Sequence, residues 1–200
     1  MKSGLNLPGY SLGSVLWRAD GRVVYRARCL ATDQPVAVET LDTEYPARHQ
    51  VASIRREGAL GQQLADVAGV RKIHAVLPHG SGNLALVGEL FDNTLKTLLV
   101  REGAWGLPVA KVLNIALGIV RALEGIHGQE VVHKALMPGH ILFDTVTTTV
   151  SISGFGIASE LDQERQAVQM SRRLEGPLPY ISPEQTGRMN RDVDYRSDYY

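Results

Sequence analysis

The sequence predicts an α+β protein in which a strand-rich first lobe precedes a helical second lobe. Two observations predict this class. In the first ninety residues the apolar side chains fall mostly in short runs bounded by turn residues, which is typical of strands. After residue 94 they recur every three or four positions, which is typical of amphipathic helices. The boundary between the two lobes is placed at residues 90–94.

The first lobe is predicted to contain a hairpin, one helix and two further strands. Residues 23–28 and 36–41 are strand-like and flank a turn-forming segment, so they should pair as an antiparallel hairpin. Apolar residues at helical spacing predict a helix over 50–67, in which Gly58 and Gly61 each cost about 1 kcal/mol relative to alanine. The further strands are expected at residues 71–77 and 84–89.

The second lobe is predicted to begin with a short helix over residues 94–101. The strongest helix in the chain starts at Pro108, which suits the first turn because its missing N–H would be unbonded there. Its apolar stripe runs from Val109 to Ile126 and predicts a buried face. Two short strands are expected at 141–143 and 150–152, and the remainder is polar and loop-like.

Charge and composition exclude several classes of protein. The 21 basic residues balance the 21 acidic ones, so no nucleic-acid or anionic-membrane partner is expected. No apolar run is long enough for membrane insertion, and the N-terminus has no signal-peptide segment. The single cysteine, Cys29, excludes an intrachain disulfide and a cysteine-based zinc site. These features favour a cytoplasmic location.

Three motifs occur in a fixed order in the second lobe. The run His133-Lys134-Ala135-Leu136-Met137-Pro138-Gly139-His140-Ile141-Leu142 has the form of a kinase catalytic loop, H-[RK]-D-x-x-P-x-N-I-L. Gly154-Phe155-Gly156 follows at the position of D-F-G, and Tyr180-Ile181-Ser182-Pro183-Glu184 at that of A-P-E. The chain therefore resembles the protein kinases over nearly its whole length, from about Tyr10 to Tyr200.

The runs LEGPLPY (174–180), QTGRMNR (185–191) and VDYRSD (193–198) make the resemblance more specific. They resemble the serine/threonine-kinase-like domains at the N-terminus of large bacterial multidomain sensor (hybrid histidine) kinases. The resemblance implies a bilobal protein-kinase-like fold, with the N-lobe over residues 1–90 and part of the C-lobe over 91–200. It also implies a truncated C-lobe, because the chain stops where the family enters the central helix of that lobe.

In the first lobe the residues matched to ATP binding have the wrong chemistry. Trp17, Ala19 and Arg22 stand where three phosphate-loop glycines are expected, although Gly13 or Gly21 could be partial survivors. Glu39 stands at the lysine of the V-A-I-K strand, which pairs with a helix glutamate matched by Glu57. Two alternatives are open for Glu39. Either Arg55 or Arg56 neutralises it, or it points into solvent.

In the second lobe the positions matched to the chemistry are also vacated. Ala135 replaces the catalytic aspartate, and Met137 replaces a residue that contacts the transferred phosphate. His140 replaces the asparagine that binds magnesium, and Gly154 replaces the metal-binding aspartate of D-F-G. Because phosphoryl transfer depends on positioning and charge, these losses together predict an inactive site.

The scaffold positions of the family are kept. The resemblance implies an adenine-pocket shape at Val24, Ala37 and Leu142, with room left by Gly88 before Glu89 at the hinge. His133 and Phe155 match an apolar column between the lobes. The remaining matches are scaffold residues of the family, Glu57, Glu184 and Asp198.

The sequence therefore predicts a pseudokinase, a regulatory or interaction module in bacterial signal transduction that binds a protein partner or an adjacent signalling module. No cofactor and no metal are expected. The alternatives are an active Ser/Thr kinase that uses ATP and magnesium through displaced groups such as Lys72, Lys134 and Asp144, or a non-functional remnant. His127, His133 and His140 are interpreted as structural rather than metal-binding, because their spacing lacks a ligand pattern. Phosphorylation of the polar loop residues Ser171, Ser182 and Thr186 is disfavoured.

Overall fold

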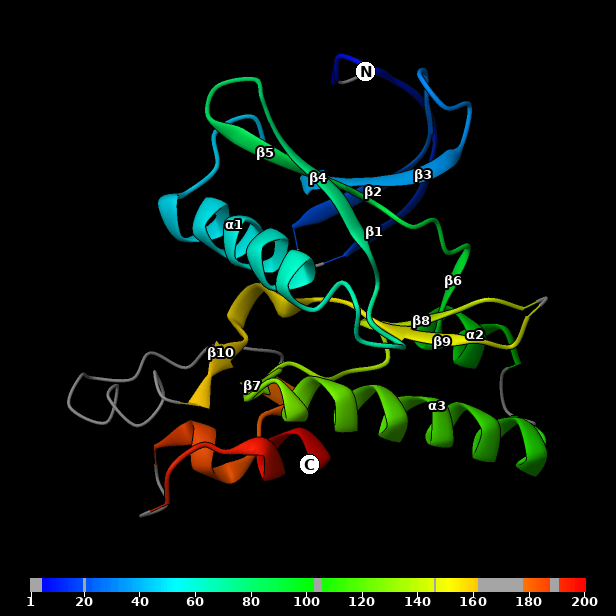
Figure 1. Ribbon diagram of the computed structural model, residues 1–200, viewed down its shortest axis with the longest axis vertical. Helices are drawn as coiled ribbons and strands as arrows, with labels where there is room; N and C mark the ends of the chain where they lie inside the picture. Colours follow the sequence, from blue (N-terminus) through cyan, green and yellow to red (C-terminus); the bar gives the residue numbers. More distant parts are fainter. Residues whose placement is uncertain (1–4, 20, 103–105, 146, 162–177, 188–190) are drawn as a thin grey trace. The chain divides into compact units, whose positions relative to one another are not determined.

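The computed structural model describes residues 5–19, 21–102, 106–145, 147–161, 178–187 and 191–200, so Ser171 and parts of the specific runs, 174–177 and 188–190, lie outside it. The fold is α+β, as predicted, with an antiparallel sheet first and helices after it (Figure 1). The chain divides into two compact units. The first unit runs through Ala65 and continues over Arg71–Asp92, and the second unit comprises Asp66–Val70 and Asn93–Tyr200.

A five-stranded antiparallel sheet forms the first unit. Its strands are β1 (Tyr10–Ala19), β2 (Arg22–Cys29), β3 (Pro35–Leu41), β4 (Ile73–His79) and β5 (Asn83–Gly88), in the order β1-β2-β3-β5-β4. The predicted hairpin is confirmed, with Ala27 opposite Val36. The two strands predicted at 71–77 and 84–89 are also confirmed, as β4 and β5, and their ends differ from the predicted ones by one or two residues. Strand β1 was not predicted, because its residues were matched to a phosphate loop.

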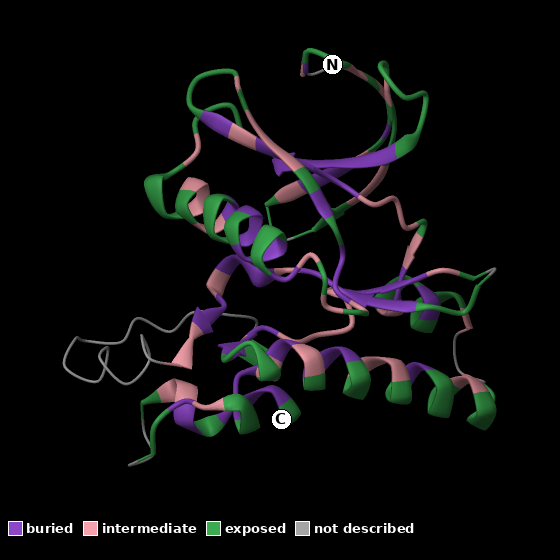
Figure 2. Cartoon of the chain, viewed as in Figure 1, coloured by how far each residue is buried: buried purple, intermediate pink, exposed green. Residues whose placement is uncertain are grey.

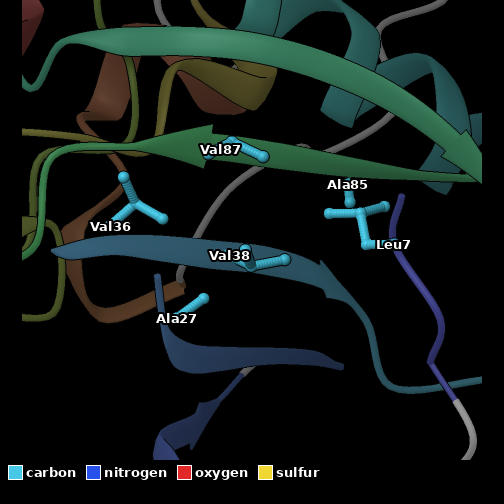
Figure 3. Packing of buried hydrophobic residues seen from close by; sticks show 6 residues of the cluster. All are labelled: Leu7, Ala27, Val36, Val38, Ala85 and Val87. Carbon is cyan, nitrogen blue, oxygen red and sulfur yellow. The ribbon is translucent and has the colours of Figure 1, made fainter. Parts of the chain in front are cut away.

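Side chains of alternating residues in the sheet form two hydrophobic clusters, since successive strand residues point to opposite faces. Figure 3 shows the buried residues of one cluster, which are Leu7, Ala27, Val36, Val38, Ala85 and Val87. The second cluster packs helix α1 (Arg48–Gln63) onto the sheet through Leu41, Ile54, Ile73 and Leu86. The sheet thus has a covered core on each side of β3.

Helix α1 differs from its prediction in two ways. It ends at Gln63 rather than at residue 67, because residues 66–70 join the second unit, where Val70 bridges to Ile152. The two glycines that weaken the helix have a packing role. A β-carbon on Gly58 would lie 2.4 Å from Val76, and one on Gly61 would lie 2.5 Å from Ile73. Larger residues at these positions would push the helix off the sheet.

In the described part of the second unit, two α-helices lie among short strands (Figure 2 colours these residues by burial). Helix α2 spans Leu95–Glu102 and α3 spans Val109–Gly128, with Pro108 at the N-cap rather than in the first turn. The strands are β6 (Asn93–Thr94), β7 (Val131–Val132), β8 (Ile141–Phe143), β9 (Val150–Ile152) and β10 (Ser159–Glu160). Short 3₁₀ turns follow at Phe155–Ile157, Leu178–Tyr180, Pro183–Thr186 and Tyr195–Tyr199. Among the described helices, none is long and apolar enough to cross a membrane.

The apolar stripe of α3 is buried over only part of its length. Its second half enters the core through Ala122, Leu123 and Ile126, each at most 2% exposed. Large apolar side chains of the first half and the middle are exposed, namely Val109, Val112, Leu113, Leu117 and Val120. The stripe therefore enters the core in its second half, while its first half, apart from Ile115, is an exposed apolar surface among the described residues.

Candidate functional site

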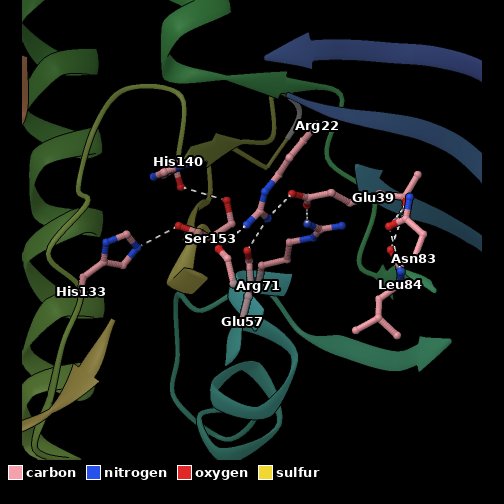
Figure 4. A network of polar contacts seen from close by, with 11 residues as sticks. Arg22, Glu39, Glu57, Arg71, Asn83, Leu84, His133, His140 and Ser153 are labelled. Carbon is pink, nitrogen blue, oxygen red and sulfur yellow. Dashed lines mark hydrogen bonds and ion pairs between the residues drawn. The ribbon is translucent and has the colours of Figure 1, made fainter. Parts of the chain in front are cut away.

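Glu39 lies on β3 inside the first unit and is buried, with 8% of its surface exposed. Its Oε1 accepts a hydrogen bond from Nη1 of Arg22 at 2.8 Å, and its Oε2 accepts one from Nη1 of Arg71 at 2.7 Å. Figure 4 shows the two guanidinium groups beside this one carboxylate. Neither alternative raised for Glu39 is correct. It does not face solvent, and its partners are Arg22 and Arg71 rather than Arg55 or Arg56.

Arg22 joins the same carboxylate to helix α1. Its Nη1 also donates to Oε2 of Glu57 at 2.5 Å, and its Nη2 donates to the hydroxyl of Ser53 at 3.1 Å. Arg22, Glu39, Glu57 and Arg71 therefore form a charge cluster with two cations and two anions. Since buried charges need partners, this balance is what allows Glu57 to be only 2% exposed.

The charge cluster sets the protonation of its members. Burial alone would raise the pKa of Glu39, but Arg22 and Arg71 outweigh burial and lower the pKa to about 2. Burial would lower the pKa of Arg22, and the carboxylates of Glu57 and Glu39 raise it instead. Glu39 is consequently a carboxylate at any physiological pH, with both of its oxygens already engaged.

Arg71 reaches Glu39 by passing Gly88, the last residue of β5. A β-carbon on Gly88 would lie 2.5 Å from the carbonyl oxygen of Lys72 and 3.5 Å from Nε of Arg71. The space into which a side chain at position 88 would extend is therefore filled by the Lys72 backbone and the Arg71 side chain. The next residue, Glu89, also contacts this segment, since its Oε2 accepts a hydrogen bond from the Lys72 N–H at 3.1 Å.

The other pocket-shape positions of the first unit are buried in the sheet. Val24 lies opposite Glu39 and is 2% exposed, while Ala37 lies opposite Gly88 and is 1% exposed. Leu142, the fifth such position, belongs to the second unit, where it is 2% exposed and pairs with Thr94 and Ser151.

Asp198 anchors the loop after β7 in the second unit. Its Oδ2 accepts from the His133 N–H at 2.9 Å and lies 2.9 Å from Nε2 of His127, while its Oδ1 accepts from the Lys134 N–H at 2.7 Å. Lys134 has a φ of +62°, a left-handed conformation that is unfavourable for a side chain of this kind. The hydrogen bonds from the His133 and Lys134 N–H groups to Asp198 hold the backbone in this conformation.

His133 is fully buried and its ring contacts define its tautomer. Nδ1 accepts from the Ala135 N–H at 3.2 Å, so the proton is on Nε2, which donates to the Ser153 carbonyl at 2.8 Å. The imidazole lies 4.7 Å from the Phe155 ring, centroid to centroid. His133 thus connects the loop containing Ala135 to the segment before Gly154.

His140 and Gly154 occupy adjoining space in the second unit. Nδ1 of His140 donates to the Ala135 carbonyl at 2.7 Å, and the His140 carbonyl accepts from the Ser153 N–H at 2.9 Å. Gly154 has a φ of +86°, and a β-carbon added there would lie 2.5 Å from Cγ of the His140 imidazole. The ring therefore fills the volume into which a side chain at position 154 would extend.

The remaining positions singled out from the sequence, Glu184, Ser182 and Thr186, make contacts within the fold. Oε1 of Glu184 accepts from the Ser197 hydroxyl at 2.6 Å. Burial would raise the pKa of Glu184, but hydrogen bonds from Ser197, Ser182 and the backbone, together with the charge of Arg191, outweigh burial and lower the pKa. Ser182 is 1% exposed and Thr186 bonds the Pro183 carbonyl. Within the described part of the chain, no three potential metal ligands cluster.

Met137 lies beside a pocket that sequence reasoning did not anticipate. The pocket has a volume of about 250 Å³ and lies wholly in the second unit. Its lining includes Leu95, Ile119, Lys134, Met137, Ile141 and Tyr199. No sequence signal points to it, because its residues come from five separate segments of the chain.

Comparison with known proteins agrees with this arrangement of elements. The model of the family described as "Protein kinase domain" matches residues 18–200. The chain belongs to the protein kinase domain family. It is 28% identical to a probable serine/threonine-protein kinase of Clostridium perfringens, over 88% of the chain and 25% of that protein. A probable serine/threonine-protein kinase of Streptomyces coelicolor is 30% identical over 96% of the chain and 28% of that protein.

A serine/threonine-protein kinase of Myxococcus xanthus is 31% identical, over 88% of the chain and 33% of that protein. The chain thus spans about a quarter to a third of the length of these three relatives. For this protein kinase domain, sequence reasoning missed the roles of Arg22 and Arg71. Arg22 could have been found, because it lies two residues before Val24, the residue paired with Glu39, and so shares a sheet face with Glu39.

Proposed function

We propose that this protein kinase domain is a catalytically inactive regulatory or interaction module of bacterial signal transduction. The observation that carries the proposal is the packing of His140 against Gly154. By resemblance, both positions belong to residues that hold magnesium in active kinases. Here an imidazole bonded to the Ala135 carbonyl fills that volume, and Gly154 offers no ligand atom.

The first unit supports the same proposal through charge. By resemblance, position 39 carries a lysine that neutralises the phosphates of ATP. Glu39 supplies a negative charge there, and both of its oxygens are bonded to arginines. A lysine about 4 Å from a phosphate charge attracts it by roughly 4 kcal/mol at an effective dielectric constant of 20, and Glu39 supplies no such attraction. The charge cluster therefore favours a domain that does not hold a triphosphate.

Ala135 removes the remaining catalytic group. The matched aspartate accepts the proton of the substrate hydroxyl, and a methyl group has no atom that can do so. The backbone around it is nevertheless held in place, since Ala135 is 3% exposed and bonded to the His133 ring. A retained scaffold with lost chemistry fits a module that binds a protein partner or an adjacent signalling module.

The test is a thermal-shift titration with ATP, with and without magnesium or manganese, beside a radiolabel-transfer assay with a general protein substrate. We expect no metal-dependent stabilisation and no transfer. Binding at 100 times the dissociation constant would add about 2.7 kcal/mol of stability, which the assay would detect. Transfer that is abolished by alanine at Lys72, Lys134 or Asp144 would refute the proposal and establish an active kinase with displaced groups.

A further inference from the structure

The outer face of helix α1 carries three arginines, Arg48, Arg55 and Arg56, all of them exposed. Within the described residues, no hydrogen bond or ion pair joins any of them to another side chain. The only acid on the helix is Glu57, which is buried and bonded to Arg22. We call the face formed by Arg48, Arg55 and Arg56 the basic ridge.

The basic ridge is unusual within its own unit. Each arginine that lies off α1 in the first unit has a carboxylate partner among the described residues. Arg18 pairs with Asp42, Arg26 with Asp92 and Arg28 with Asp33, while Arg22 and Arg71 belong to the charge cluster. Unpaired arginines are thus confined to one helix face rather than scattered over the unit.

The start of α1 places positive charge where a helix least favours it. Arg48 and His49 are its first two residues, no acid is present in the first turn, and Ala47 has no side chain that could cap it. The aligned peptide dipoles already give a helix N-terminus a partial positive charge, so an approaching anion would be stabilised there. Tyr45, three residues before the helix, is 76% exposed. Tyrosine and arginine are enriched at protein interfaces.

The inner face of α1 fixes how the basic ridge is presented. Gly58 and Gly61 bring the helix into close contact with β4, and the Glu57–Arg22 ion pair attaches it to β2. A rigid surface loses little conformational entropy when a partner binds. The basic ridge therefore belongs to a helix that is already held in one position on its sheet.

We propose that the basic ridge is a docking surface for an acidic segment of a partner protein. This inference rests on the proposed interaction function and gives it a location and a chemistry. Arg48 and Arg55 are seven residues apart, which places them about 10 Å apart along the helix axis. In a polyproline II segment, which has three residues per turn and a rise of about 3.1 Å per residue, acidic residues three positions apart lie on one face with nearly the same spacing, about 9 Å. Ala52 and Ala59, both exposed, leave the face between the arginines unobstructed.

A nucleic acid or a membrane surface fits this chain less well. Both partners are bound through a broad positive field, and here basic and acidic residues are equal at 21 each. The other arginines of the first unit are each paired with a carboxylate. A short acidic segment needs only the local charge of one helix face, which is what α1 supplies.

The probe is a fluorescein-labelled peptide of Glu-Glu-Ala repeats, titrated with the whole 200-residue chain and followed by fluorescence anisotropy. The test variant is Arg55→Glu with Arg56→Glu. The matched control is Arg28→Glu with Arg101→Glu, the same charge change at exposed sites off α1. We expect saturable binding that weakens with salt, falls at least about tenfold in the test variant and changes less than about twofold in the control.

Equal weakening in both variants, or no saturable binding, would overturn the docking surface. So would tighter binding of a DNA duplex or of phosphatidylserine vesicles than of the peptide. Circular dichroism and thermal unfolding of both variants confirm that they are folded. The assay contains no ATP, so phosphoryl transfer would refute the proposed function without affecting this result, and loss of peptide binding would leave the proposed function standing.

Discussion

The imidazole of His140 and a side chain at position 154 compete for one volume, since a β-carbon on Gly154 would lie 2.5 Å from the ring. Restoring aspartate at this position alone therefore creates a clash rather than a metal ligand. The relationship also means that the effect of a substitution at position 154 depends on which residue stands at position 140, and the reverse. A return to metal binding would require both positions to change together.

Gly154→Asp is expected to destabilise the protein by about 1–3 kcal/mol through overpacking against His140. Adding His140→Asn should recover part of the loss, because the smaller side chain leaves room. Urea unfolding of the two single variants and the double variant measures this coupling. Gly187→Asp is the matched control, since Gly187 also has a positive φ but nothing within 4 Å of its β-carbon position. Purely additive effects would contradict the shared volume.

Glu39→Lys is expected to cost about 3–5 kcal/mol, because it places a third cation beside Arg22 and Arg71 with only Glu57 to balance them. The same change at Glu44, an exposed loop residue, should alter stability by less than about 0.5 kcal/mol. Thermal and denaturant unfolding of both variants provides the comparison. If Glu39→Lys were as stable as Glu44→Lys, the charge cluster would not contribute to the fold.

Glu39 is also expected to make the free energy of unfolding depend on pH in the acidic range. Its pKa is about 2 in the folded protein and about 4.5 when unfolded, so the folded state binds fewer protons between these values. The stabilisation is complete above pH 4.5 and is lost as the pH falls from 4.5 towards 2. Unfolding free energies of the wild type and Glu39→Gln, measured from pH 7 down to pH 2, should converge in this range. Parallel curves would show that Glu39 does not titrate there.

The exposed part of α3 predicts a contrast between two leucines of the same helix. Leu113 is 57% exposed, so Leu113→Lys should leave the unfolding temperature nearly unchanged and reduce concentration-dependent association. Leu123 is 2% exposed, so Leu123→Lys should cost several kcal/mol by burying an unpaired charge. Light scattering and thermal unfolding give the two readouts. A large loss of stability in Leu113→Lys would mean that this face is covered.

Much of the fold could be predicted from the sequence because it depends on local patterns. Short strand-like runs on either side of a turn located β2 and β3, and the three-to-four spacing of apolar residues located α3. The contacts of Arg71 could not be predicted. It precedes β4, and its side chain reaches Glu39 only because Gly88 lies between them, which is a property of the assembled sheet. The filled volume at Gly154 was missed for the same reason, since His140 comes from another segment.

Asp198 has a consequence for the order in which the second unit can form. It is 64 residues away from Lys134, whose left-handed backbone it supports. Closing a segment of this length has an entropic cost before any contact compensates it, and such long-range contacts form late in folding. We therefore expect the loop after β7 to acquire its native shape last, and a growing chain to lack that shape until Asp198 has been synthesised.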